Sequence, residues 1–418
     1  YTHEANRGAA RAWRITGVAM RNPALRDAMA PAGWAYDLGI MSPEGLRVER
    51  IAVHDRVLVA AESPDLVVDA IADPEVFAVT LTVTEKGYSL TADGALDTED
   101  PGVASDLRAG TTRSAIGLLA RGLTLRALRG GGAVTVLSCD NLGGNGRLLH
   151  GAVREFLAAS DQPASALNDV RFPDTMVDRI TPATTPAVEA RMEAAAGRAV
   201  VAPLMTEGFT EWVIEDTGGA LPDWTRAGAL LVPDVGPHER RKLLLLNGAH
   251  TALAYGGLLR GHDFVHQTVA DAALMDHVRA LWTEAAPLLP EFATDDLAAY
   301  SQALTTRFSV SALEHRLSQI AMDGSAKLPQ RILPILRHHR FRAPAASRVM
   351  GDWWRVLTLR HERGEPLDDP MARALRDAIG SDAPEAERFL QVMRLLGVPA
   401  SDLPDCFAIA CLSPGQDS

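Results

Sequence analysis

Residues 76–84 read Val-Phe-Ala-Val-Thr-Leu-Thr-Val-Thr, a dense run of apolar and β-branched side chains. Such a run is typical of a strand that is buried on both faces of a parallel sheet. A second run, Ala-Val-Thr-Val-Leu-Ser at 133–138, follows a helical pattern over 106–129 that ends in three glycines. Glycines directly after a helix are a strong stop signal. Strands that alternate with helices predict an α/β fold with a doubly wound parallel sheet.

The pattern extends outward from these strands and then changes. Further strands are predicted at 14–20, 48–53 and 56–61, and a helix at 66–72. After about residue 200, a β-like stretch at 211–214 precedes helical patterns at 237–260, 264–288, 295–305, 310–322, 328–340, 345–362, 368–379 and 384–395. A chain of 418 residues exceeds what one hydrophobic core usually holds. We therefore expect an α/β domain over 1–199 and a mainly helical domain over 200–418.

Composition and charge narrow the classes of partner. Hydrophobic residues make up 47% and charged residues 22%, an ordinary globular balance. The net charge of -12 argues against nucleic acid as a partner, and we interpret the basic stretch 337–342 as a solvated helix end. No apolar run approaches the roughly 18 residues of a membrane span. The three cysteines lack metal-ligand spacing, which predicts a cytoplasmic setting and no metal site.

Residues 242–250, Lys-Leu-Leu-Leu-Leu-Asn-Gly-Ala-His, combine three polar groups with apolar surface. On an α-helix, Asn247 would lie about 140° from Lys242 and His250 about 80° from it, so one broad face would hold all three. A lysine on the buried side of a helix is unfavourable unless it is paired or deprotonated. The alternative is structural: a lysine that reaches solvent, a capping asparagine and a satisfied core histidine.

Three other segments place polar residues at the ends of predicted strands. Ser138-Cys-Asp-Asn-Leu-Gly-Gly-Asn-Gly146 follows the strand at 133–138, where ligands bind in open α/β sheets, although such residues also form ordinary turns. Residues 172–182, Phe-Pro-Asp-Thr-Met-Val-Asp-Arg-Ile-Thr-Pro, hold an Asp–Arg pair that could be a structural salt bridge. Thr82-Val-Thr-Glu-Lys-Gly-Tyr88 is either a strand-to-loop turn or a cofactor contact.

Together these segments resemble the polyol-specific long-chain dehydrogenase/reductase family, of the mannitol dehydrogenase and fructuronate reductase type. The strings that carry the resemblance are TVTEKGY (82–88), SCDN (138–141), FPDTMVDRITP (172–182), EWVIED (211–216), KLLLLNGAH (242–250) and QIAMDGSAKLPQR (319–331). The resemblance implies a Rossmann-type dinucleotide-binding domain followed by a largely helical substrate and catalytic domain. It places the family's Lys-x4-Asn-x2-His motif on Lys242, Asn247 and His250, a second asparagine on Asn141, and a proton path on Glu239.

These residue types suit carbonyl reduction. Hydride addition to a carbonyl needs a proton donor at the oxygen, and the reverse reaction needs a base there. Lys242 is expected to fill both roles, while the amides of Asn141 and Asn247 stabilise the developing alkoxide. His250 is expected to hold a neighbouring substrate hydroxyl.

The sequence also departs from the family pattern. Family members begin with a strand and a Gly-rich turn that approaches the cofactor pyrophosphate, and we expect this chain to lack both. Arg21, after the strand at 14–20, is a candidate cofactor contact, as are Thr84, Glu85 and Lys86. We expect NAD because the family mostly uses it, and NADP stays open.

The expected substrate is a keto sugar acid of the fructuronate/mannonate type. Residues 319–331 resemble the fructuronate reductase branch, and Lys327 and Arg331 could place positive charge near a carboxylate. Asp178 is a further candidate substrate contact. The alternatives are a neutral polyol dehydrogenase, for mannitol or arabinitol, and a truncated remnant without turnover. The sequence does not fix the oligomeric state.

Overall fold

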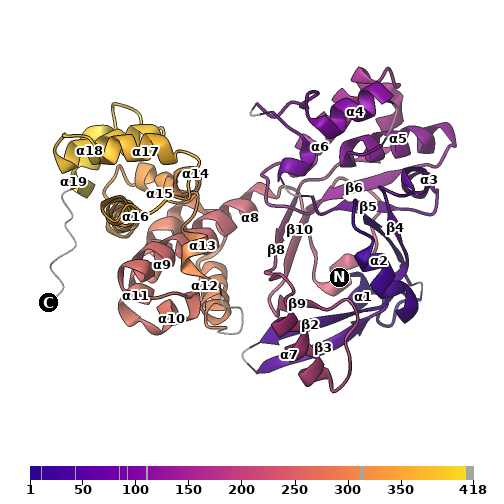
Figure 1. The fold of residues 1–418 in the computed structure, drawn as a ribbon, viewed down its shortest axis with the longest axis horizontal. Helices are drawn as coiled ribbons and strands as arrows, with labels where there is room; N and C mark the ends of the chain where they lie inside the picture. The colour runs from indigo at the N-terminus through magenta and orange to yellow at the C-terminus, as the bar shows by residue number, and fades with distance from the viewer. Residues whose placement is uncertain are drawn as a thin grey trace. The chain divides into compact units, whose positions relative to one another are not determined.

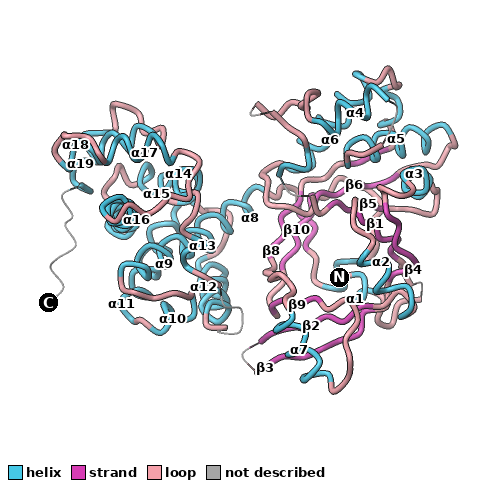
Figure 2. The backbone as a smooth tube through the Cα atoms, in the orientation of Figure 1, coloured by secondary structure: helices cyan, strands magenta, loops and turns pink. Residues whose placement is uncertain are grey.

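The computed structural model describes the chain except residues 11, 43, 84, 92, 110, 111, 311–314 and 411–418. It divides into two compact units, Tyr1–His238 and Glu239–Ser418. The strands of the described residues all lie in the first unit, and the second is helical (Figure 2). The expected order of an α/β part and a helical part is confirmed. Residues 200–238 group with the first unit, a different division from the predicted 199/200 boundary, because they supply three strands to its sheets.

The first unit contains eleven strands and several covering helices among its described residues. The strands are β1 (Ile15–Ala19), β2 (Tyr36–Ser42), β3 (Gly45–Ile51), β4 (His54–Val59), β5 (Ala78–Leu81), β6 (Val134–Ser138), β7 (Val170–Arg171), β8 (Thr175–Asp178), β9 (Leu204–Glu207), β10 (Glu211–Glu215) and β11 (Leu230–Val232). The main helices are α1 (Thr2–Ala5), α2 (Ala24–Met29), α3 (Pro64–Ala72), α4 (Pro101–Ala109), α5 (Ala115–Leu128), α6 (Asn145–Ala159) and α7 (Pro186–Ala196).

Two of the sheets are wholly parallel. β1 pairs with β4, and β5 pairs with β6, which in turn pairs with β7, all in parallel. Every residue of β6 is buried, as the apolar run at 133–138 predicts. Two further sheets have mixed directions: β3–β2–β9 and β11–β10–β8. β2 was not predicted, because the buried Asp37 and the central Gly39 interrupt its apolar pattern.

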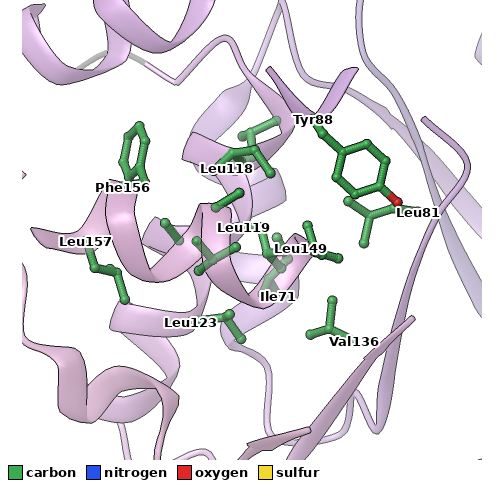
Figure 3. Close-up of a cluster of buried hydrophobic side chains, with 14 of the residues drawn as sticks. Ile71, Leu81, Tyr88, Leu118, Leu119, Leu123, Val136, Leu149, Phe156 and Leu157 are labelled. Atoms are coloured by element: carbon green, nitrogen blue, oxygen red, sulfur yellow. The ribbon is translucent and has the colours of Figure 1, made fainter. Parts of the chain in front are cut away.

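Helices α3, α5 and α6 cover the ladders with one apolar core. Figure 1 shows α5 and α6 on the same side of β5 and β6. Ile71 of α3, Leu119 of α5 and Phe156 of α6 interlock in this core (Figure 3). Met20, Val83 and Leu142, which lie one, two and four residues after the ends of β1, β5 and β6, pack against the same cluster. The carboxyl ends of these three strands therefore border one core.

The predicted helix over 106–129 is wrong in one respect, since the structure has two helices there. α4 ends at Ala109 and α5 begins at Ala115. The carboxylate of Asp106 accepts the backbone N–H groups of Arg113 and Ser114 at 2.7 and 2.8 Å. The Ser114 hydroxyl in turn accepts the N–H of Gly117 at 2.9 Å and caps α5. These hydrogen bonds end the first helix and start a second one, so the two helices are not continuous.

The second unit is a bundle of helices. Its main elements are α8 (Gly236–Arg241, which begins in the first unit), η5 (Lys242–Asn247), α9 (Gly248–Leu259), α10 (Val265–Ala270), α11 (Ala272–Ala285), α12 (Thr294–Phe308), α13 (Leu317–Ile320), α14 (Gly324–Arg331), α15 (Leu333–His338), α16 (Pro344–Glu362), α17 (Ala372–Ile379), α18 (Glu385–Leu395) and α19 (Leu403–Ala410). α9 lies at its centre, because ten of its residues are buried and it contacts α10, α11, α13 and α16. No helix among the described residues combines the length and apolar character that crossing a membrane requires.

Several predicted helices of this unit are shorter or divided. The pattern at 264–288 splits at Asp271, whose carboxylate accepts the N–H groups of residues 273 and 274 and starts α11. The pattern at 328–340 divides at Ile332, just before Pro334 in the first turn of α15. Within the predicted helix 310–322, residues 311–314 lie outside the described residues and only α13 is helical among the rest.

Candidate active site

A π-helical turn carries two of the predicted catalytic residues. The chain runs without a break through α8, η5 and α9, and η5 is a π-helix from Lys242 to Asn247. The prediction of a regular α-helix over 237–260 is therefore corrected. A π turn pairs residue i with i+5, so Lys242 and Asn247 lie one turn apart on the same side rather than on opposite edges of a broad face. Short π turns are frequent at functional sites.

Side chains from neighbouring positions hold the π turn in place. A π turn shifts the backbone pairing, so that the Gly248 N–H donates to the carbonyls of both Leu243 and Leu245, and side chains add further donors. The indole N–H of Trp282, from α11, donates to the carbonyl of Leu245 at 2.9 Å. The Thr251 hydroxyl donates to the carbonyl of Asn247 at 2.8 Å. Leu244, Leu245 and Leu246 are buried, whereas Lys242 and Asn247 are half-buried. The apolar side of the turn thus faces the bundle core.

His250 is a buried, uncharged imidazole. It is 8% exposed, and its ring lies 4.7 Å from the ring of Phe308 and 5.2 Å, edge-on, from that of His315. Burial holds the pKa of His250 well below its usual range, and the nearby His315, Arg307 and Arg331 lower it further. A neutral imidazole can both donate and accept a hydrogen bond. His250 is thus suited to bind a hydroxyl group.

Cationic side chains gather around His250. Burial lowers the pKa of Arg331 to about 10. Burial, and then the charge of Arg331, also lowers the pKa of Lys327, which Asp323 and Asp369 partly offset. Like charges in a partly buried site favour an anionic ligand, because the ligand relieves their repulsion.

The structure anchors both predicted substrate cations on α14. Lys327 Nζ donates to the carbonyls of Ile320 and Met322 at 3.2 and 2.6 Å and lies 4.0 Å from a carboxylate oxygen of Asp323. Arg331 Nη1 donates to the Thr251 hydroxyl at 3.2 Å. Lys327 therefore also holds the turn before α14, while Arg331 contacts the helix that carries His250.

α14 can begin where it does only because residue 324 is a glycine. A Cβ at Gly324 would lie 2.5 Å from the indole nitrogen of Trp353 and 2.6 Å from the Tyr255 hydroxyl oxygen. This close approach sets the distance between α14 and α9.

Asn141 lies in the first unit, in the loop between β6 and α6, and is exposed. The neighbouring Asp140 fixes this loop, since its carboxylate accepts the Ser138 hydroxyl at 2.7 Å, the Leu142 N–H at 2.8 Å and the buried Tyr88 hydroxyl. Asn145 fixes it further by donating to the carbonyls of Ser138 and Thr175 at 3.1 and 3.0 Å. The SCDN segment is thus a braced loop rather than a simple turn.

The other predicted contacts of the first unit are placed as follows. Asp178 is 4% exposed at the end of β8, opposite Glu211 in the antiparallel register with β10. The adjacent Arg179 donates to the carbonyl of Glu207 at 3.2 and 3.3 Å. Arg21 is exposed after β1. Glu85 and Lys86 begin η2 (Glu85–Tyr88), and Thr84 lies outside the described residues.

The predicted residues therefore fall into two groups. Asn141 and Asp178 belong to the first unit, and the second unit brings His250 and Arg331 together with the π turn. Glu239, half-buried on α8, lies three residues before Lys242.

Sequence reasoning missed Thr251, Trp282, Arg307 and His315. Thr251 had a signal, because it directly follows His250 and lies four residues after Asn247. The other three come from distant elements and have no local pattern.

A possible metal-ligating group was also missed. His3, Glu4 and Glu49 lie together in the first unit. Arg7 lies 3.2 Å from the carboxylate of Glu4 and 3.6 Å from that of Glu49, and Arg47 also pairs with Glu49. These contacts make the group an ion-pair network.

Comparison with known proteins agrees with this arrangement. The mannitol dehydrogenase Rossmann domain matches residues 6–225, and the mannitol dehydrogenase C-terminal domain matches residues 234–406. D-mannonate oxidoreductase of Escherichia coli (strain K12) is 40% identical over 351 residues, which cover 81% of this chain and 72% of that protein. The resemblance inferred from the motifs is confirmed.

Two solved structures are similar over nearly the whole chain. Substrate-free D-sorbitol dehydrogenase has a TM-score of 0.85 at 26% identity and covers 95% of this chain and 86% of its own. The ternary complex of Pseudomonas fluorescens mannitol 2-dehydrogenase with NAD and D-mannitol has a TM-score of 0.77 at 30% identity, covering 98% and 87%.

Proposed function

The chain belongs to the mannitol dehydrogenase family, and from that premise we propose that it interconverts a keto sugar acid and its hydroxy acid, of the fructuronate and mannonate type, with NAD. Membership makes it an oxidoreductase of alcohol and carbonyl groups in sugar acids or polyols. The proposal adds the acidic substrate.

The charge around His250 is the observation that carries this proposal. Arg307, Lys327 and Arg331 lie close enough to act on the two neighbouring imidazoles of His250 and His315. Asp323 and Asp369 offset the charge beside Lys327 only in part, and an anionic ligand at Arg331 would be favourable in this partly buried site. A sugar acid brings a carboxylate that a guanidinium can bind through two parallel hydrogen bonds.

The first unit fits a dinucleotide. Met20, Val83 and Leu142 place the carboxyl ends of β1, β5 and β6 beside one core, and ligands bind at such ends in open α/β sheets. Arg21 and the segment of Thr84, Glu85 and Lys86 follow two of these strands, and we assign the cofactor contacts to them. NAD, when bound, accepts or returns the hydride of the alcohol carbon.

The remaining chemistry is assigned to side chains of this chain. Lys242 takes the proton from the substrate hydroxyl in oxidation and returns it in reduction. The amide of Asn247 donates a hydrogen bond to the reacting oxygen as negative charge develops on it, contributing about 10²–10³-fold to the rate, and the family resemblance gives Asn141 the same type of role. The neutral His250 and the carboxylate of Asp178 bind neighbouring hydroxyls. Glu239 passes the proton of Lys242 to solvent.

A substrate panel tests the proposal. Purified protein is assayed with D-mannonate, D-mannitol and D-arabinitol, each with NAD and with NADP. We expect kcat/KM for D-mannonate to exceed that for D-mannitol by about tenfold to hundredfold, which corresponds to one or two charge-assisted hydrogen bonds. Replacing Arg331 by Gln should raise KM for D-mannonate and leave KM for a neutral polyol within about twofold. Equal or better use of D-mannitol would contradict the acidic substrate.

The second candidate function is that of a neutral polyol dehydrogenase. The similarity to the mannitol 2-dehydrogenase complex favours it, because this similarity extends over 98% of the chain. The same panel separates the two candidates.

A further inference from the structure

Thr251 links two parts of the candidate site through a single hydroxyl. It lies on α9 directly after His250 and is 3% exposed. Its oxygen lies 2.8 Å from the carbonyl of Asn247 and 3.2 Å from Nη1 of Arg331. A guanidinium has only donors, and a hydroxyl has a single hydrogen. The direction of both hydrogen bonds is therefore fixed: Arg331 donates to the Thr251 hydroxyl, which donates to the carbonyl of Asn247.

One of these bonds alone would need no functional explanation. A threonine hydroxyl often bonds the carbonyl four residues earlier in its own helix. The bond from Arg331 is different, because that residue comes from α14, 80 positions later. A buried guanidinium keeps its charge only if polar partners replace water. Thr251 supplies such a partner and thereby fixes where the guanidinium lies.

Both residues that the Thr251 hydroxyl connects, Asn247 and Arg331, belong to the candidate site. Asn247 closes the π turn that begins at Lys242. The backbone carbonyl oxygen of Arg331 lies close to Gly248, the first residue of α9. The start of α9 and the end of α14 are thus packed against each other beside the π turn, and the Thr251 hydroxyl is the polar contact between them.

We propose that Thr251 is a positioning residue, which holds Arg331 at a fixed distance from the π turn. Arg331 binds the substrate's carboxylate, and the amide of Asn247 lies at its reacting end. A fixed distance between these two groups then matches the length of one substrate molecule. This inference rests on the proposed function. Thr251 itself does not contact substrate; it acts through Arg331.

The test compares two substitutions of nearly equal size. Thr251→Val removes the hydroxyl and keeps the branched shape, whereas Thr251→Ser keeps the hydroxyl. With D-mannonate and NAD we expect the valine variant to raise KM about tenfold, the usual effect of losing a hydrogen bond to a charged group. The serine variant should stay within about twofold of the parent. Thermal unfolding of each variant verifies that it is folded.

A double-mutant cycle with Arg331→Gln tests the link itself. If Thr251 acts through Arg331, adding Thr251→Val to Arg331→Gln should change KM by less than about twofold. Multiplicative effects would overturn the proposal, as would equal effects of valine and serine. A lower melting temperature with unchanged KM would reduce Thr251 to a structural role and also overturn it.

The design separates this inference from the proposed function. If the parent oxidises D-mannitol and not D-mannonate, the acidic substrate is wrong. The same four proteins are then compared on D-mannitol. Non-additive effects on kcat/KM there support the positioning role, and additive effects overturn it.

Discussion

The indole nitrogen of Trp282 donates a hydrogen bond to the carbonyl oxygen of Leu245 at 2.9 Å, in the middle of the π turn that carries Lys242 and Asn247. Trp282 is 8% exposed, so water cannot easily replace it as a partner. A buried hydrogen bond of this kind contributes about 0.5–1.5 kcal/mol. The carbonyl also accepts the backbone N–H of Gly248, so Trp282 adds a second, tertiary hydrogen bond to the π turn.

The first prediction concerns this bond. Trp282→Phe keeps an aromatic ring and loses the donor, so we expect a lower melting temperature and a fall in kcat of about tenfold or more as the turn relaxes. Trp354→Phe is the matched control. It removes a similar hydrogen bond, which the Trp354 indole donates to Glu385 at 3.1 Å, away from the π turn. It should lower the melting temperature without lowering kcat. Equal losses of kcat in the two variants would show that the fall in kcat does not come from a change in the π turn.

The second prediction concerns Lys242. Lys242→Met removes the amine and keeps the length of the side chain. Because a general acid/base contributes about 10²–10⁴-fold, kcat should fall by that factor while NADH affinity and melting temperature change little. Arg240→Met removes a cation from the same helix that is 48% exposed and paired with Glu291, and its kcat should stay near the parent value. More than half of the parent activity in Lys242→Met would exclude the assignment.

The features predicted from the sequence are those with a local pattern. The run at 133–138 is buried at every position of β6, because a strand covered on both faces needs apolar side chains throughout. The Lys-x4-Asn-x2-His spacing likewise lies within one continuous helical segment.

The features that were missed depend on tertiary contacts. The run of four leucines after Lys242 is apolar on every side, so no periodicity distinguishes a π turn from an α turn. The turn's tertiary hydrogen bond comes from Trp282, 37 residues away from Leu245. Likewise, β2 includes Asp37 at a buried position, which its arginine partners make tolerable. No single-sequence pattern reveals a charge whose partners lie elsewhere in the chain.

The third prediction is a pH dependence of stability. Asp37 is fully buried; burial opposes its ionisation, but hydrogen bonds from Arg198, the Val201 N–H and Arg50 outweigh this and lower its pKa to about 2. Because the folded pKa lies below the ordinary 3.8, the ionised group adds stability above about pH 4, and this stability is lost as the pH falls toward 2.

Two asparagine variants test this dependence. Asp37→Asn should lower stability at pH 7 by about 1–3 kcal/mol, and its difference from the parent should shrink as the pH falls from 4 to 2. Asp276→Asn, at a side chain that is 74% exposed, should match the parent throughout. Melting temperatures measured across this range provide the comparison. A difference between Asp37→Asn and the parent that stays constant down to pH 2 would mean that Asp37 does not stabilise through its charge.

The last prediction uses two helical glycines with opposite surroundings. A Cβ at Gly324 would lie 2.5 Å from the indole nitrogen of Trp353 and 2.6 Å from the Tyr255 hydroxyl oxygen, whereas a Cβ at Gly351 meets nothing within 4 Å. Gly324→Ala should therefore push α14 away from α9 and lower the melting temperature, and its shift of Arg331 should raise KM for D-mannonate. Gly351→Ala should raise the free energy of unfolding by about 0.5–1 kcal/mol, because alanine is more stable than glycine in a helix interior.

Both variants are measured by thermal unfolding and by initial rates with D-mannonate and NAD. The comparison separates a steric effect from a general effect of adding a methyl group to a helix of this unit. The Gly351→Ala variant should keep the KM of the parent, since residue 351 lies inside α16 and its added methyl group has open space around it. If Gly324→Ala kept both the stability and the KM of the parent, Trp353 and Tyr255 would have to yield without moving α14. The distance between α14 and α9 would then not depend on this glycine.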